Sequence, residues 1–135
     1  MLQTDPQNLN LLLAKASMAA IIQDIETEIE TLKKIIKINP ITNVKSLLAQ
    51  AYLRKNDGIV NEFIKKLIDE VLFEKPKDPG ANFILAKYLN QNGNKNKSRN
   101  LLLKILKNLD DKGPWYQIYK DCLLYTSDAA DDSGC

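Results

Sequence analysis

The sequence predicts an all-α fold, an α-solenoid in which antiparallel helix pairs stack along one axis. Two observations predict it. Pro6 and Pro40 are 34 residues apart, and Pro76 follows 36 residues later. A period of this length is typical of helical repeats. Between successive prolines lie two segments whose apolar residues recur at steps of three and four, the spacing of one helix face. No segment alternates with a period of two, so no strand is predicted.

The first predicted pair lies between Leu9 and Pro40. Apolar residues from Leu9 to Ala20 share one helix face, and small alanines on that face allow a close approach to a partner. The second helix opens at Asp24. Its early glutamates and late lysines complement the helix dipole. Asn39 and Pro40 end it, because the residue before a proline is pushed out of the helical region.

The same plan repeats along the chain. Helical spacing recurs in Val44–Tyr52, Val60–Leu72, Ile84–Leu89, Leu101–Leu109 and from Trp115 onward. Breaking sequences separate these segments: KNDG at 55–58, KPKDPG at 75–80, NQNGN at 90–94 and DDKGP at 110–114. The chain is therefore expected to contain about three helix pairs, with partial pairs at both ends.

This pattern resembles the tetratricopeptide repeat family, whose units are helix–turn–helix pairs closed by proline. Three units are expected, at about 9–42, 43–78 and 79–112. The small positions of the family fall on Ala16, Ala49 and Ala86 in the first helices, and on Glu28, Glu62 and Ser98 in the second. The turn glycine is matched by Gly93 alone, with Gln23 and Asn56 in the other units. The resemblance covers 1–121, interpreted as a fragment of a longer array that Met1 enters in mid-repeat.

Residues 122–135 are predicted to be an artefactual tail. The segment CLLYTSDAADD, from Cys122 to Asp132, resembles the translation of a transposase-type sequencing adapter. Both cysteines of the chain, Cys122 and Cys135, lie in this tail, so neither indicates a redox compartment.

The resemblance implies a concave groove lined by the first helix of each unit. A polar groove with a few apolar positions suits an extended peptide, so the chain is expected to be a scaffold that binds a peptide or protein segment. The groove candidates are Asn10, Leu13, Ser17, Asn43, Ser46, Gln50, Arg54, Phe83, Lys87 and Asn90. The Lys/Asn/Arg clamp with which one subclass binds C-terminal carboxylates is unmatched, so that activity is not expected.

Two other functions stay open. The chain could be the substrate-recruiting arm of a larger enzyme, such as a glycosyl- or sulfotransferase, whose catalytic part lies elsewhere. It could also bind RNA, since Lys95, Lys97 and Arg99 cluster in one segment. Nucleic-acid binding is disfavoured, because no aromatic residue lies beside this cluster to stack on bases.

Composition argues against catalysis within this sequence. The chain has no histidine, and its cysteines lie only in the tail, so the usual general base and thiol nucleophile are missing. Carboxylates do not cluster with the spacing of a metal site, and no glycine-rich phosphate loop is present. No enzyme activity, metal or cofactor is therefore predicted. No apolar run is long enough to span a bilayer, and the cytoplasm is the favoured location.

Overall fold

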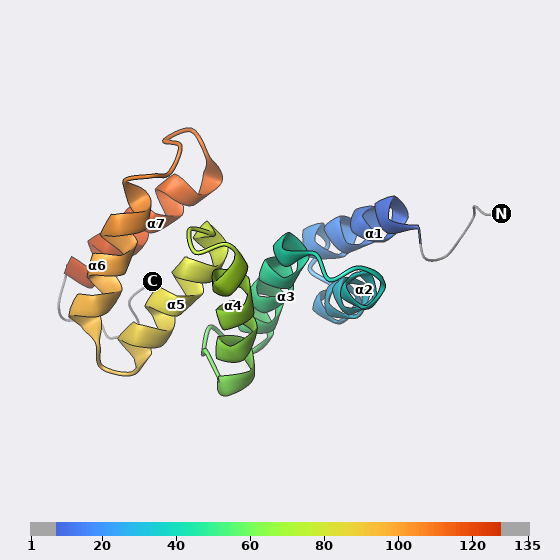
Figure 1. Ribbon diagram of the computed structural model, residues 1–135, viewed down its shortest axis with the longest axis horizontal. Helices are drawn as coiled ribbons and strands as arrows, with labels where there is room; N and C mark the ends of the chain where they lie inside the picture. Colours follow the sequence, from blue (N-terminus) through green and yellow to red (C-terminus); the bar gives the residue numbers. More distant parts are fainter. Residues whose placement is uncertain (1–7, 128–135) are drawn as a thin grey trace.

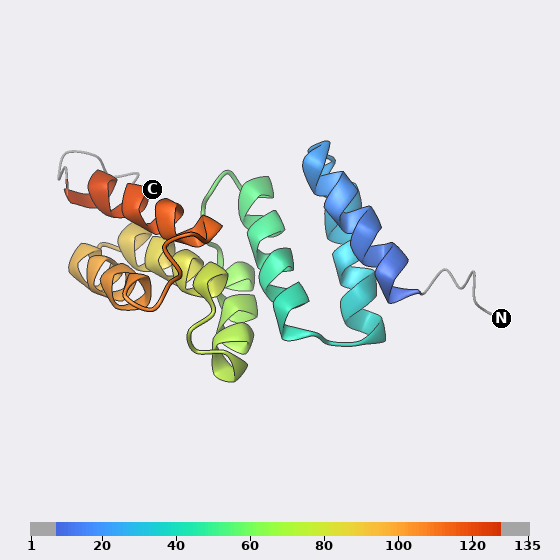
Figure 2. The same cartoon turned by 90° about the horizontal axis from the view of Figure 1, so that it is seen from above.

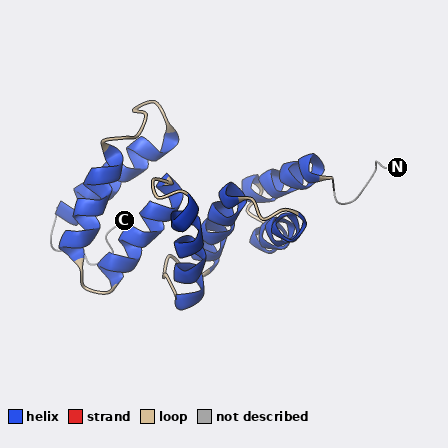
Figure 3. Cartoon of the chain, viewed as in Figure 1, coloured by secondary structure: helices blue, strands red, loops and turns tan. Residues whose placement is uncertain are grey.

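The computed structural model describes residues 8–127, and this part of the chain is helical with no strand (Figures 1 and 3). Its helices are α1 (Leu9–Ile21), α2 (Ile25–Ile38), α3 (Thr42–Lys55), α4 (Glu62–Glu74), α5 (Pro79–Gln91), α6 (Lys95–Leu106) and α7 (Pro114–Ser127). Each helix packs on the next one in sequence order. The predicted all-α class is confirmed, and the order of packing is consistent with a helical repeat.

Four helices begin at a capping residue whose side-chain oxygen accepts a hydrogen bond from the first turn: Asn8, Asp24, Asn61 and Asp78. Each cap satisfies a backbone N–H group that has no partner within the helix. Hydrogen bonds from the Thr27 side chain and backbone hold the pKa of Asp24 below its ordinary value. The start of each of these four helices is therefore determined by a capping side chain that directly precedes it in the sequence.

The turns inside the three helix pairs share one geometry. Gln23 (φ 63°), Asp57 (φ 56°) and Gly93 (φ 84°) all adopt the left-handed conformation. In each turn the next residue donates its N–H to a carbonyl five positions earlier, as from Asp24 to Ala19 at 2.8 Å. This bond closes a Schellman cap. The sequence aligned the middle turn position with Asn56, one residue before Asp57, because the unit 43–78 is two residues longer than the 34-residue period.

The core consists of three clusters arranged along the chain. The first joins α1, α2 and α3, and the second joins α3, α4 and α5. The third joins α5, α6 and α7 around Tyr119 and Ala86. The alanines expected at helix contacts, Ala16, Ala49 and Ala86, are all buried. Ser98 occupies the matching small position of α6 and donates a hydrogen bond from Oγ to the Ala86 carbonyl at 2.7 Å.

Contacts between the first helices of successive pairs are unequal. The backbone of α3 approaches that of α5, and α5 approaches α7, whereas no Cα atom of α1 lies within 8 Å of one in α3. In Figure 2 the blue pair α1 and α2 accordingly lies to one side of the green α3. The pair formed by α1 and α2 is therefore joined to the other described helices through α2 and α3.

Helix α7 continues past the predicted boundary between 121 and 122. It ends at Ser127, and Cys122 on it is buried in the third cluster. The boundary was inferred from the resemblance of Cys122–Asp132 to translated adapter sequence, and it stays a prediction. The remainder of the predicted tail, 128–135, lies outside the described residues.

Candidate functional site

The junction between α3 and α5 uses two of the predicted groove residues. Ser46 donates from Oγ to Asp78 Oδ2 at 2.9 Å, and Gln50 Nε2 donates to Ser46 Oγ at 3.3 Å. Asp78 also caps α5, so one carboxylate ties both helices together. The helices approach so closely at Gly80 that a Cβ there would lie 2.5 Å from Gln50 Nε2. Ser46 and Gln50 therefore hold α5 against α3.

Aromatic side chains fill the junction between α5 and α7. The Phe83 ring lies 5.5 Å from Trp115 and 5.9 Å from Tyr119, measured between centroids. Tyr119 donates its hydroxyl to the Pro79 carbonyl at 2.6 Å, and burial raises its pKa far above the ordinary value. Lys87 Nζ lies 5.7 Å from the Phe83 centroid, and burial lowers the Lys87 pKa. Phe83 and Lys87 thus belong to a packed junction.

The outer candidates have other surroundings. Asn43 is exposed and accepts a hydrogen bond from Lys75 Nζ at 2.8 Å. Asn90 is buried, and Asn10 is exposed on the first turns of α1. These three residues do not meet in a common cavity among the described residues, and a binding role for them stays a prediction.

Arg54 pairs with a buried glutamate of α2. Its Nη2 lies 2.7 Å from Glu28 Oε2, and the Glu28 side chain is 7% exposed against 49% for Arg54. The second carboxylate oxygen, Oε1, is buried and accepts no hydrogen bond from the described residues. A buried acceptor without a donor destabilises a fold by roughly 1–3 kcal/mol. Glu28 therefore retains capacity for one more donor.

Beside Glu28 lies a cavity of about 100 Å³, here called the α1–α3 cavity. It is lined by Leu13, Ala16, Ser17, Ala20, Glu28, Leu32 and Leu47. Two predicted groove residues, Leu13 and Ser17, meet here, one turn apart on α1. Leu47 closes the opposite side from α3 and is 44% exposed, although it shares the apolar spacing of its helix. The cavity lies between α1 and α3, whose backbones do not approach each other closely.

Sequence reasoning missed Glu28 and Leu47 as site residues. The available signal was Glu28 itself, a charged residue where the repeat pattern calls for a small one. Ser98 fills the equivalent position of α6 and is buried with a backbone partner. Glu28 instead carries a longer side chain, which reaches Arg54 of α3 and lines the cavity.

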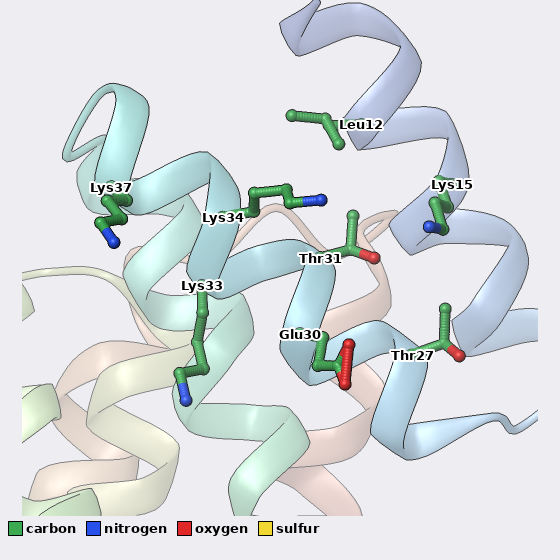
Figure 4. Close-up of a pocket in the computed structure, with 8 residues that line it drawn as sticks. All are labelled: Leu12, Lys15, Thr27, Glu30, Thr31, Lys33, Lys34 and Lys37. Atoms are coloured by element: carbon green, nitrogen blue, oxygen red, sulfur yellow. The ribbon is translucent and has the colours of Figure 1, made fainter. Parts of the chain in front are cut away.

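A second hollow lies between α1 and α2, with a volume of about 400 Å³. Figure 4 shows its lining, in which Lys34 extends from α2 toward α1 while Lys33 points away from α1. Lys15 and Lys37 complete the lysines, and Glu30 is the one acidic residue of the lining. Such a surface attracts anions without selecting among them. The sequence did not single out this group of lysines.

In the part of the chain that the structure covers, no three side chains able to ligate a metal gather at one point. None of the described helices combines the length and apolar character that crossing a membrane requires.

Comparison with known proteins returned no match to a protein-family model, to a curated protein or to a solved structure.

Proposed function

We propose that this chain is a binding scaffold of the tetratricopeptide type, which takes a peptide or protein segment on the face where α1 and α3 diverge. The observation that carries the proposal is the α1–α3 cavity. It combines aliphatic walls with a hydroxyl and a carboxylate, and ligand sites commonly pair mostly apolar walls with a few polar groups. Leu47 and Ser17 stand exposed at this cavity.

The other two junctions support this choice by contrast. Between α3 and α5 the polar groups of Ser46 and Asp78 bond each other, and between α5 and α7 the aromatic rings pack together. The polar groups of the first junction and the aromatic rings of the second are therefore engaged by partners within the chain. The proposed binding surface accordingly lies in the N-terminal half and is smaller than the ten-residue groove that the sequence suggested.

Selection from a random dodecapeptide display library tests the proposal. The immobilised chain should retain a family of peptides, and the affinities should be measured by fluorescence anisotropy. Leu47→Asp should weaken binding at least about tenfold, because it places an unpaired charge in an apolar contact. Its matched control is Phe73→Asp. Phe73 is also a large exposed apolar residue, 88% exposed on α4, and it lies outside the cavity lining.

Three results would contradict the proposal. The first is that no peptide survives selection. The second is that the selected peptides bind Leu47→Asp as tightly as the native chain. The third is that both variants lose binding equally, which would indicate general damage or adhesion to exposed apolar side chains.

A further inference from the structure

We infer that the α1–α3 cavity is a lysine pocket: it receives the side chain of a lysine from the bound segment, with Glu28 as the acceptor for its ammonium group. This inference rests on the proposed function and specifies the chemistry of the partner. Three properties of the cavity carry it: its size, the character of its walls and the state of the Glu28 carboxylate.

The volume of the α1–α3 cavity limits its occupant to a narrow, unbranched side chain. An apolar cavity of roughly 150 Å³ accepts a benzene molecule, so one of about 100 Å³ holds roughly four or five heavy atoms. A lysine side chain beyond Cβ has this size. An indole or a guanidinium on its three-carbon stem is larger, so tryptophan and arginine are disfavoured.

The walls are suited to an aliphatic stem. Leu13, Ala16, Ala20, Leu32 and Leu47 supply methyl and methylene groups from three helices. The stem of a lysine gains free energy by burying its methylene groups, while its charged end seeks a polar partner. A short hydroxyl or amide side chain would leave most of this apolar wall uncovered.

The Glu28 carboxylate supplies the polar partner. Arg54 reaches Oε2, and Oε1 has no donor among the described residues. An ionised carboxylate offers about four acceptor sites, so the pair with Arg54 does not exhaust it. Glu28 is among the residues that line the cavity, so a donor held there lies near this carboxylate. Arg54 is half exposed, so water screens the attraction between its guanidinium and Glu28 more than it would screen that of an ammonium group inside the cavity.

The direct test uses n-butylammonium as a probe, because it reproduces the end of a lysine side chain. The probe is titrated into chain labelled with ¹³C at the alanine methyl groups. We expect saturable shifts at Ala16 and Ala20, which line the cavity, and little change at Ala49, which does not. n-Butanol, which keeps the stem and loses the charge, should bind at least about tenfold more weakly, as expected for loss of a charge-assisted hydrogen bond.

Two variants and one matched control complete the test. Glu28→Gln removes the charge and should reduce the preference for n-butylammonium over n-butanol to about twofold or less. Ser17→Leu fills the cavity from an exposed position, so it should abolish probe binding while the fold is kept. The control is Glu26→Gln, on the same helix but exposed and paired with Lys55, which should bind like the native chain.

The outcomes separate this inference from the proposed function. Equal binding of n-butanol and n-butylammonium would overturn the lysine pocket, as would unchanged discrimination by Glu28→Gln or the absence of any shift at Ala16 and Ala20. In the selected dodecapeptides, replacing an anchoring lysine with norleucine should weaken binding at least about tenfold. Peptides that bind at Leu47 without depending on a lysine would refute the pocket and leave the scaffold function standing.

Discussion

The pair formed by Arg54 and Glu28 yields a stability prediction with an internal control. Replacing Arg54 with Met keeps an apolar stem and removes the guanidinium, so Oε2 of Glu28 loses its donor and neither carboxylate oxygen then has one among the described residues. Breaking a fully buried pair in this way costs roughly 3–5 kcal/mol. Because Arg54 is 49% exposed, water can reach the vacated side, and we expect a loss of about 2–3 kcal/mol in the free energy of unfolding.

Urea unfolding followed by circular dichroism measures this loss. With an m-value of about 1–3 kcal/mol per molar urea, the midpoint should fall by roughly 0.7–3 M. Lys55→Met is the matched control. Lys55 neighbours Arg54 on α3, but its partner Glu26 is 68% exposed. Breaking that exposed pair should change the free energy of unfolding by less than about 0.5 kcal/mol.

A second substitution identifies the cause of the loss. Adding Glu28→Gln to Arg54→Met replaces a buried unpaired charge with a neutral amide, which is far less costly to bury. The double variant should therefore be more stable than Arg54→Met alone. The reasoning is refuted if Arg54→Met and Lys55→Met destabilise the chain equally, or if the double variant regains nothing.

Three further predictions concern other parts of the fold. Gln23→Gly should raise the free energy of unfolding by about 0.5–1 kcal/mol, since glycine adopts the left-handed conformation without strain; a lower urea midpoint would contradict this. Tyr119→Phe removes the hydrogen bond to Pro79 and should lower the free energy of unfolding by about 1 kcal/mol at pH 7. Burial raises the Tyr119 pKa, so the unfolded phenol ionises first and the native chain should lose stability above about pH 10. If the Tyr119→Phe chain loses stability as steeply above this pH, Tyr119 is not the cause of the loss. Ser98→Ala removes the hydrogen bond to Ala86 and should cost about 1 kcal/mol, with increased thermal stability as the opposing result.

Features set by neighbouring residues could be predicted from the sequence. The helix segments follow from apolar spacing, and the breaks follow from proline, glycine and asparagine between them. The left-handed turn at Gln23 was also accessible, because the repeat pattern aligned it with Gly93. Burial of the three alanines at helix contacts follows from the same alignment.

The state of each polar side chain in the groove could not be predicted in this way. Ser46 bonds Asp78, 32 positions away, and Arg54 bonds Glu28, 26 positions away. Which residues pair in this way depends on the angle at which successive helix pairs pack. The spacing of residues within one helix carries no information on that angle. Residues that looked equivalent by register therefore differ: Ser46 is engaged in packing, while Ser17 stands exposed beside a cavity.

The contacts of this fold connect each described helix with its near neighbours in the chain, and this has a thermodynamic consequence. Stability in such a chain is close to a sum of local terms, as in a one-dimensional array. The pair α1 and α2 meets the rest of the described array at one close backbone approach, that between α2 and α3. Amide hydrogen exchange should therefore reveal two opening units, with α1 and α2 exchanging as a group while α5, α6 and α7 keep their protection.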